Sequence, residues 1–97
     1  LGNRAEALDG YTKALKIREQ LAAANPETPN GRAITAKLYE SLGDYYFPQD
    51  LKQAKTRFEQ SLTIWQELQS NNTILPSDAK KPDEVRQKIE KCDAKLK

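Results

Sequence analysis

The sequence of 97 residues has no histidine, a single cysteine and no long apolar run. The absence of histidine removes the commonest general base and the commonest metal ligand in proteins. Cys92 has no second cysteine with which to form an internal disulfide, so nothing in the sequence requires an oxidising compartment. The formal net charge of +2 favours neither nucleic acid nor a strongly acidic partner.

Signals for membranes and secretion are also missing. No stretch approaches the roughly 20 apolar residues that a membrane-spanning helix needs. No basic start followed by an apolar segment indicates a secretory signal. We therefore expect a cytoplasmic protein. Because the chain begins with Leu1 rather than Met, we also expect a fragment of a longer protein.

The residues that are abundant favour helices. Ala, Glu, Lys, Leu and Arg make up 46 of the 97 residues, close to the share of about half that is typical of long helices. Proline and asparagine clusters divide the chain, and there is no strand signal of any strength. We predict helices over 4–24, 31–46, 51–69 and 82–96, with a single helical turn at 77–79. Pro82 is predicted as the first residue of the last helix.

The sequence matches itself when it is shifted by 47 positions. The matches recur every three or four residues, which is the spacing of one helix face. Both copies also begin with a capping residue and a polar partner three residues later, Asn3 with Glu6 and Asp50 with Gln53. Internal repeats of this length indicate a helical solenoid. The matched positions are Ala7 and Ala54, Tyr11 and Phe58, Ala14 and Ser61, Leu15 and Leu62, Ile17 and Ile64, and Leu21 and Leu68.

The apolar spacing also predicts which side chains face the interior. This placement makes Cys92 a core residue rather than a nucleophile. Trp65 is expected to pack against the last helix, although an exposed Trp at this place would suit a binding hot spot. The interior residues are predicted as Ala7 or Leu8, Tyr11, Leu15 and Leu21; Ile34, Leu38, Leu42 and Tyr45; Leu51, Ala54, Phe58, Leu62, Trp65 and Leu68; and Val85, Ile89, Cys92 and Leu96.

Two of the predicted helices resemble a tetratricopeptide repeat (TPR). The first half of the pattern is Tyr39, Leu42-Gly43 and Tyr46, and the second half is Ala54, Phe58 and Ser61-Leu62. Small residues at 43 and 54 would let the two helices approach closely, and Phe58 would fill the gap beside them. The resemblance implies an all-α fold of antiparallel helix-hairpin repeats, an α-solenoid fragment with a C-terminal capping helix. Its parts would be 1–24, the second helix of a truncated repeat; 25–70, one full repeat; 71–81, a linker; and 82–97, the cap.

The sequence departs from the usual TPR pattern in its length. The repeat spans 47 residues rather than about 34, and the turn at 48–50 is short and lacks glycine. Such long repeats resemble those of kinesin light chains and those appended to bacterial serine/threonine protein kinases. Segments 64–68 and 81–85 are most similar to the end of the kinase-linked arrays. The 97 residues contain no kinase motif, so a catalytic domain would lie upstream.

These features predict a non-catalytic scaffold that binds a protein or peptide. We expect no catalytic residue, no cofactor and no metal site, because Cys92 has no Cys or His companion. We expect no nucleic-acid partner, since the basic last helix carries no aromatic residue, and no membrane partner. The alternative is a structural or regulatory appendage of a multidomain bacterial serine/threonine protein kinase, with no ligand of its own.

The resemblance also implies a binding face. In TPR arrays the first helix of each repeat lines a concave groove, which here corresponds to Lys37, Glu40, Asp44 and Phe47. Arrays that grip a C-terminal carboxylate carry basic and amide side chains where this chain has Glu40 and Asp44. We therefore expect a neutral or basic ligand, with Phe47 as an apolar contact. The alternative is that these carboxylates only form a solvated helix face.

The first helix is expected to lack a partner on one side. In the TPR register it is the second helix of its repeat, and the first helix of that repeat precedes the sequence. Leu8, Tyr11 and Leu15 would then be covered only in part by the second helix. An exposed apolar remainder favours a homodimer through this helix.

Overall fold

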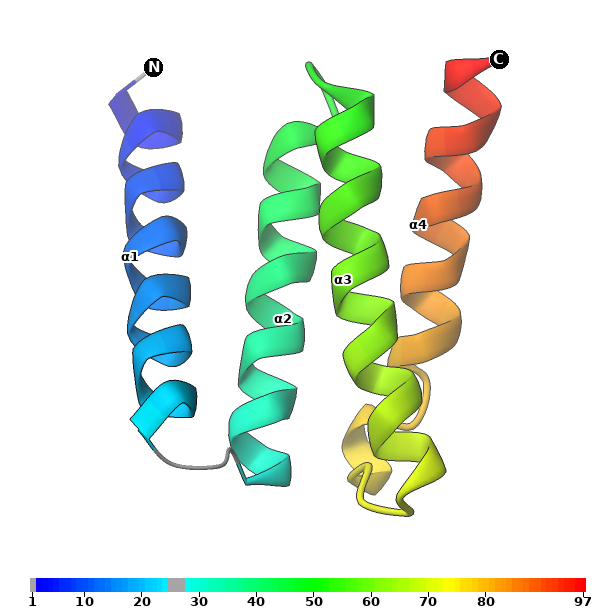
Figure 1. The fold of residues 1–97 in the computed structure, drawn as a ribbon. Coiled ribbons are helices and arrows are strands. Elements are labelled where there is room, and N and C mark those ends of the chain that lie inside the picture. The colour runs from blue at the N-terminus through cyan, green and yellow to red at the C-terminus, as the bar shows by residue number, and fades with distance from the viewer. Residues whose placement is uncertain (1, 25–27) are drawn as a thin grey trace.

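The computed structural model describes the backbone of residues 2–24 and 28–97, and the side chains in these ranges from Arg4 onward. Neighbouring helices lie side by side in chain order and run antiparallel (Figure 1). The predicted cap at Asn3 and the predicted helix break at 25–27 lie outside the described side chains and residues. The elements are α1 (Gly2–Ala24), α2 (Pro29–Tyr46), α3 (Leu51–Ser70), the 3-10 helix η1 (Pro76–Asp78) and α4 (Lys81–Leu96).

The all-α class predicted from the sequence is confirmed. Within the described ranges there are four α-helices and no strand, and each helix end lies within two residues of its predicted place. The single turn predicted at 77–79 is the 3-10 helix η1, one residue earlier. No helix in the described part of the chain is both long enough and apolar enough to cross a membrane.

The two central helices, α2 and α3, each begin at a capping residue whose side chain binds a backbone N–H of the first turn. The hydroxyl of Thr28 accepts a hydrogen bond from the backbone N–H of Gly31 at 3.1 Å, and Pro29 is the first residue of α2. Asp50 caps α3 as predicted, because its carboxylate accepts from the side chain of Gln53 at 3.0 Å and from its backbone N–H at 3.1 Å. These two hydrogen bonds hold the pKa of Asp50 below its ordinary value.

Two further residues, Asn72 and Pro82, explain where α3 ends and where α4 begins. Asn72 adopts a left-handed conformation with φ of 56°, and the N–H of Thr73 then donates to the carbonyl of Leu68 at 2.9 Å. Asparagine tolerates this conformation, so α3 ends there. Helix α4 begins at Lys81 rather than at Pro82. Pro82 is the second helical residue, where a missing N–H also leaves no intrahelical bond unmade.

The centre of the molecule is the close contact between α2 and α3. Gly43 of α2 lies under the ring of Phe58, and a Cβ at position 43 would overlap that ring. The hydroxyl of Ser61 donates to the backbone carbonyl of Ala36 at 2.8 Å, so the short serine side chain of α3 reaches the backbone of α2. Phe58, Ala36 and Ser61 are all buried. The predicted close approach of the two helices is therefore confirmed.

Helix α4 packs against α3. Val85 and Cys92 are fully buried in one cluster with Trp65 and Leu68, as the sequence predicted. Burial raises the pKa of the Cys92 thiol, which makes the reactive thiolate scarce at neutral pH. Trp65 has no exposed surface, so the alternative that it is an exposed binding hot spot is wrong.

Among the described helices, α1 packs mainly on α2, and no helix lies on its outer side (Figure 1). Leu15 is buried there. Near the start of the helix, the guanidinium of Arg4 donates to the backbone carbonyl of Tyr45 at 2.8 Å and lies 4.6 Å from the centre of the Tyr45 ring.

Three residues that were predicted to face the interior are exposed: Leu21 to 50%, Ile34 to 48% and Leu96 to 41%. Leu21 follows the buried Leu15 by six residues, a rotation of about 240°, so the two cannot share a face. Ile34 is separated from the buried Leu42 by a rotation of about 80° around the axis of α2. Leu96 ends α4 and borders a hollow at the end of the bundle.

The Gly43 contact predicts opposite effects for two glycine substitutions. We expect Gly43→Ala to lower the free energy of unfolding by about 1–3 kcal/mol, because the new Cβ displaces the Phe58 ring. Gly10→Ala in α1 is the matched control, since only its own helix backbone lies near its Cβ position. We expect it to stabilise the chain by up to about 1 kcal/mol. Urea unfolding measures both, and a Gly43→Ala variant as stable as the parent would contradict this account of the contact.

Candidate functional site

The four residues predicted to line a groove lie on one side of α2. Lys37, Glu40 and Asp44 are separated by three and four residues, and Phe47 follows the last residue of the helix. In the structure this side of α2 faces η1 and α4. Three of the four side chains form ion pairs with those two elements.

Glu40 is the centre of this charge cluster. Its two carboxylate oxygens lie 3.3 Å from the ammonium nitrogen of Lys81 and 2.8 Å from that of Lys88, and its side chain is only 10% exposed. Lys88 also binds both carboxylate oxygens of the more exposed Asp44, at 2.9 and 3.1 Å. Lys37 extends the cluster with an ion pair of 3.3 Å to the buried Asp78 of η1.

Burial and pairing act in opposite directions on these groups. Burial by itself would raise the pKa of Glu40, but the ammonium groups of Lys88 and Lys81 outweigh it and hold that pKa below the ordinary 4.5. Burial would lower the pKa of Lys88, but its hydrogen bonds to Glu40 and Asp44 outweigh it and raise that pKa above 10.5. Both groups therefore stay charged throughout the neutral range.

An apolar cleft adjoins the charge cluster. It has a volume of about 210 Å3 and lies between the end of α2 and α4. The ammonium group of Lys88 lies 5.6 Å from the centre of the Phe58 ring at its base, a cation–π distance. The cleft is of a size for one apolar side chain. It is lined by Asp44, Phe47, Pro48, Phe58, Lys88 and Lys91.

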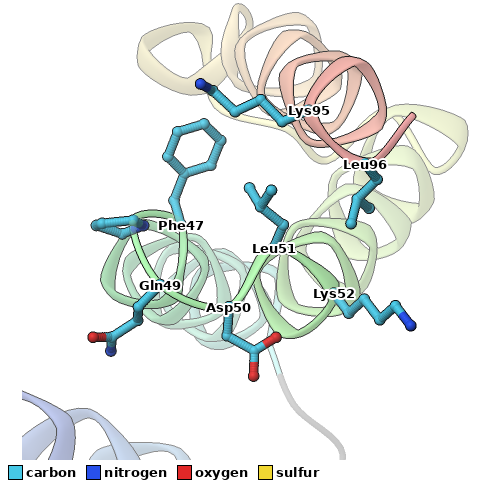
Figure 2. Close-up of a pocket in the computed structure, with 8 residues that line it drawn as sticks. Phe47, Gln49, Asp50, Leu51, Lys52, Lys95 and Leu96 are labelled. Carbon is cyan, nitrogen blue, oxygen red and sulfur yellow. The ribbon is translucent and has the colours of Figure 1, made fainter.

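A second and wider hollow, of about 610 Å3, opens at the end of the bundle (Figure 2). Figure 2 shows Phe47 and Leu51 pointing toward α4, whereas Asp50 points away. The ammonium group of Lys95 lies 6.0 Å from the centre of the Phe47 ring. Phe47 therefore borders both hollows, with apolar surface at the base and charged groups at the rim. The wider hollow is lined by Phe47, Pro48, Gln49, Asp50, Leu51, Lys52, Lys95 and Leu96.

The arrangement is suited to binding. It offers one half-exposed carboxylate, that of Asp44, and an apolar wall at Phe47. The described residues include no group of three or more His, Cys, Asp or Glu side chains placed to hold a metal ion. The sequence pattern brought the four groove residues together but missed their partners. Lys81 and Lys88 lie seven residues apart on one face of α4, which was the one available signal.

No protein-family model, curated protein or solved structure matches this chain. Function is therefore inferred from the contacts, charges and burial within the chain itself.

The low pKa of Glu40 predicts acid sensitivity. A carboxylate whose pKa is lowered by folding stabilises the fold above its ordinary pKa of 4.5, and that contribution is lost as the pH falls through the lower, folded value. We expect Glu40→Gln to cost about 1–2 kcal/mol at pH 7, because Lys81 and Lys88 lose their shared partner. Below pH 4.5, the free energy of unfolding of the variant should also depend less on pH than that of the parent.

Urea unfolding followed by the fluorescence of Trp65, the one tryptophan of the sequence, measures this effect from acid to neutral pH. Glu90→Gln on the exposed side of α4 is the control and should leave the pH profile unchanged. Identical pH profiles for Glu40→Gln and the parent would show that the cluster does not stabilise α4.

Proposed function

We propose that this chain is a non-catalytic protein-interaction scaffold of the cytoplasm, a TPR-like segment of a larger protein. One observation supports the proposal: the two helices that resemble each other in sequence both pack on the helix that follows them. Helices α1 and α3 match when the sequence is shifted by 47 positions, and each packs antiparallel on the helix that follows it (Figure 1). A module that adds helices in one direction presents an extended surface, which is the property that repeat proteins use for binding.

The two edges of the module differ, which supports a terminal role for α4. The side of α4 that faces away from α3 is polar, with Arg86 and Glu90 among its exposed residues. The outer side of α1 exposes the apolar Ile17 and Leu21 instead. Terminal repeats need a polar outer face. In this proposal α4 closes the array at its C-terminal end.

The ligand-binding face of the scaffold is the side of α2 that carries Lys37, Glu40, Asp44 and Phe47. The ammonium groups of Lys81 and Lys88 are already bound to Glu40 and Asp44, so they are not free to hold a carboxylate of a ligand. Asp44 keeps half of its side chain exposed beside the apolar cleft. The ligand is therefore a neutral or basic peptide with an apolar side chain next to Phe47.

A second function is favoured by the same ion pairs. Three of the four groove side chains bind η1 and α4 of their own chain, which is what a face with no external ligand would do. In this alternative the chain is a structural or regulatory appendage of a multidomain enzyme. The resemblance of its long repeats suggests a bacterial serine/threonine protein kinase.

A peptide titration separates the two functions. We expect the 97-residue chain to bind a basic or neutral peptide with a central Phe or Leu, and not an acidic peptide with a free C-terminal carboxylate. Phe47→Ala should weaken that binding by about tenfold, because it removes the apolar contact. Leu75→Ala removes an exposed apolar side chain far from the cleft and is the control.

Isothermal titration calorimetry gives the affinities. Measurable binding of the acidic peptide, lost in Glu40→Ala or Asp44→Ala, would contradict the proposed ligand class. A folded chain that binds none of the peptides would favour the appendage.

A further inference from the structure

Helix α1 carries a second apolar face that its own chain leaves uncovered. Ile17 and Leu21 are 55% and 50% exposed. Gly10 has nothing but its own helix backbone within 4 Å of its Cβ position. Glycine is the least favourable residue in a helix interior after proline, and no contact within the chain accounts for it here. We name this face the open stripe of α1; it consists of Gly10, Ala14, Ile17, Leu21 and Ala24, at steps of three and four residues.

The internal repeat indicates what kind of structure covers such a face. The matching positions of Ile17 and Leu21 in α3 are Ile64 and Leu68, which are only 4% and 5% exposed. They belong to the cluster that α3 forms with α2, where small residues of α2 allow a close approach. Equivalent positions are thus buried by a helix in one copy of the repeat and left open in the other. The open stripe is therefore a face that fits a helix with small residues.

The open stripe itself supplies those small residues. Its first half is small, with Gly10 and Ala14, and its second half is large, with Ile17 and Leu21. If a second copy of α1 lies antiparallel on it, Gly10 comes opposite Leu21 of the second copy and Ala14 comes opposite Ile17. Each large side chain then meets a small one, as Phe58 meets Gly43 within the chain.

We propose that two copies of this chain associate through the open stripes of their α1 helices, packed antiparallel about a twofold axis. The stripe is bordered on its outer side by Glu6, Lys13 and Gln20, and the antiparallel arrangement sets Lys13 beside Gln20 rather than beside another lysine. The sequence-based expectation of a homodimer placed Leu8, Tyr11 and Leu15 at the contact. The structure directs these residues toward α2, with Leu15 buried, so the contact is on a different face.

This inference names one partner for the scaffold and in that respect rests on the proposed function. Sedimentation equilibrium of the 97-residue chain, over concentrations from about 10 μM to 1 mM, tests it. We expect a monomer–dimer equilibrium that Ile17→Asp weakens by at least about tenfold, because it places a charge in the apolar contact. Ile34→Asp is the matched control: Ile34 is 48% exposed but lies on α2, so its replacement should leave the equilibrium unchanged.

Two further variants separate loss of contact from loss of folding. Gly10→Leu should weaken the dimer by a similar factor while it raises the melting temperature of the monomer, because leucine is the better helix former. Adding Leu21→Ala to Gly10→Leu exchanges the large and the small side of the pair. This double variant should restore association, and its failure to do so would overturn the antiparallel pairing.

Other results would overturn the inference as a whole. A strict monomer at every concentration would do so, as would equal effects of Ile17→Asp and Ile34→Asp. A monomer that binds a peptide of residues 28–47 through Ile17 would show that the stripe takes a helix like α2 instead of a second copy. A monomer that still binds a groove peptide through Phe47 would leave the scaffold function standing, so failure of the two proposals is distinguishable.

Discussion

The close approach of α2 and α3 at Gly43 and Phe58 is the constraint on which the rest of the molecule depends. The absence of a side chain at 43 lets the Phe58 ring lie between the helices, and the Ser61–Ala36 hydrogen bond fixes the same short separation two turns away from it. Trp65, two turns along α3 from Phe58 and on the same side of that helix, is buried in one cluster with Val85 and Cys92 of α4. The Phe58 ring also lies beneath the ammonium group of Lys88, so the apolar core and the charge cluster share one aromatic ring.

The charge cluster complements this packing by specifying position. Apolar contacts between α3 and α4 are compatible with several small shifts along the helix axes, because they have little directional preference. A buried carboxylate between two lysines is compatible with far fewer, since a shift would leave Glu40 unpaired at high cost. In this chain, apolar burial supplies the attraction between the helices, and Glu40 with Lys81 and Lys88 selects the register.

The sequence predicted the helices well because their ends are determined by nearby residues. Each of these helix ends is set within one turn by its own residues: the start of α3 by Asp50 with Gln53, the start of α2 by Pro29, and the end of α3 by Asn72. It also predicted most of the interior of α3, which has one broad apolar face. It failed for Ile34 because α2 contacts α1, α3 and α4 on three different faces, and a single apolar stripe cannot describe such a helix.

The candidate site was predictable only in part, for a related reason. Helical spacing placed Lys37, Glu40, Asp44 and Phe47 on one face, and they do share it. The lysines that pair with the two carboxylates follow them by 41 to 48 residues, and no local pattern connects the two segments. A charged residue on a helix face reads as solvated until the neighbouring helix is known, and Glu40 is a case in which that reading is wrong.

The one-sided attachment of α1 has a consequence for how stability is distributed along the chain. Helix α3 lies between two neighbours, whereas α1 is held by Leu15 and by the contacts of Arg4 at Tyr45. Local opening requires less free energy where fewer apolar contacts are lost. Amide hydrogens of α1 should therefore exchange with solvent through partial unfolding, ahead of those in α3, which should exchange only when the whole bundle opens. On this basis we expect residues 28–97 to unfold as one cooperative three-helix unit and α1 to open separately, with a stability set by whatever covers it.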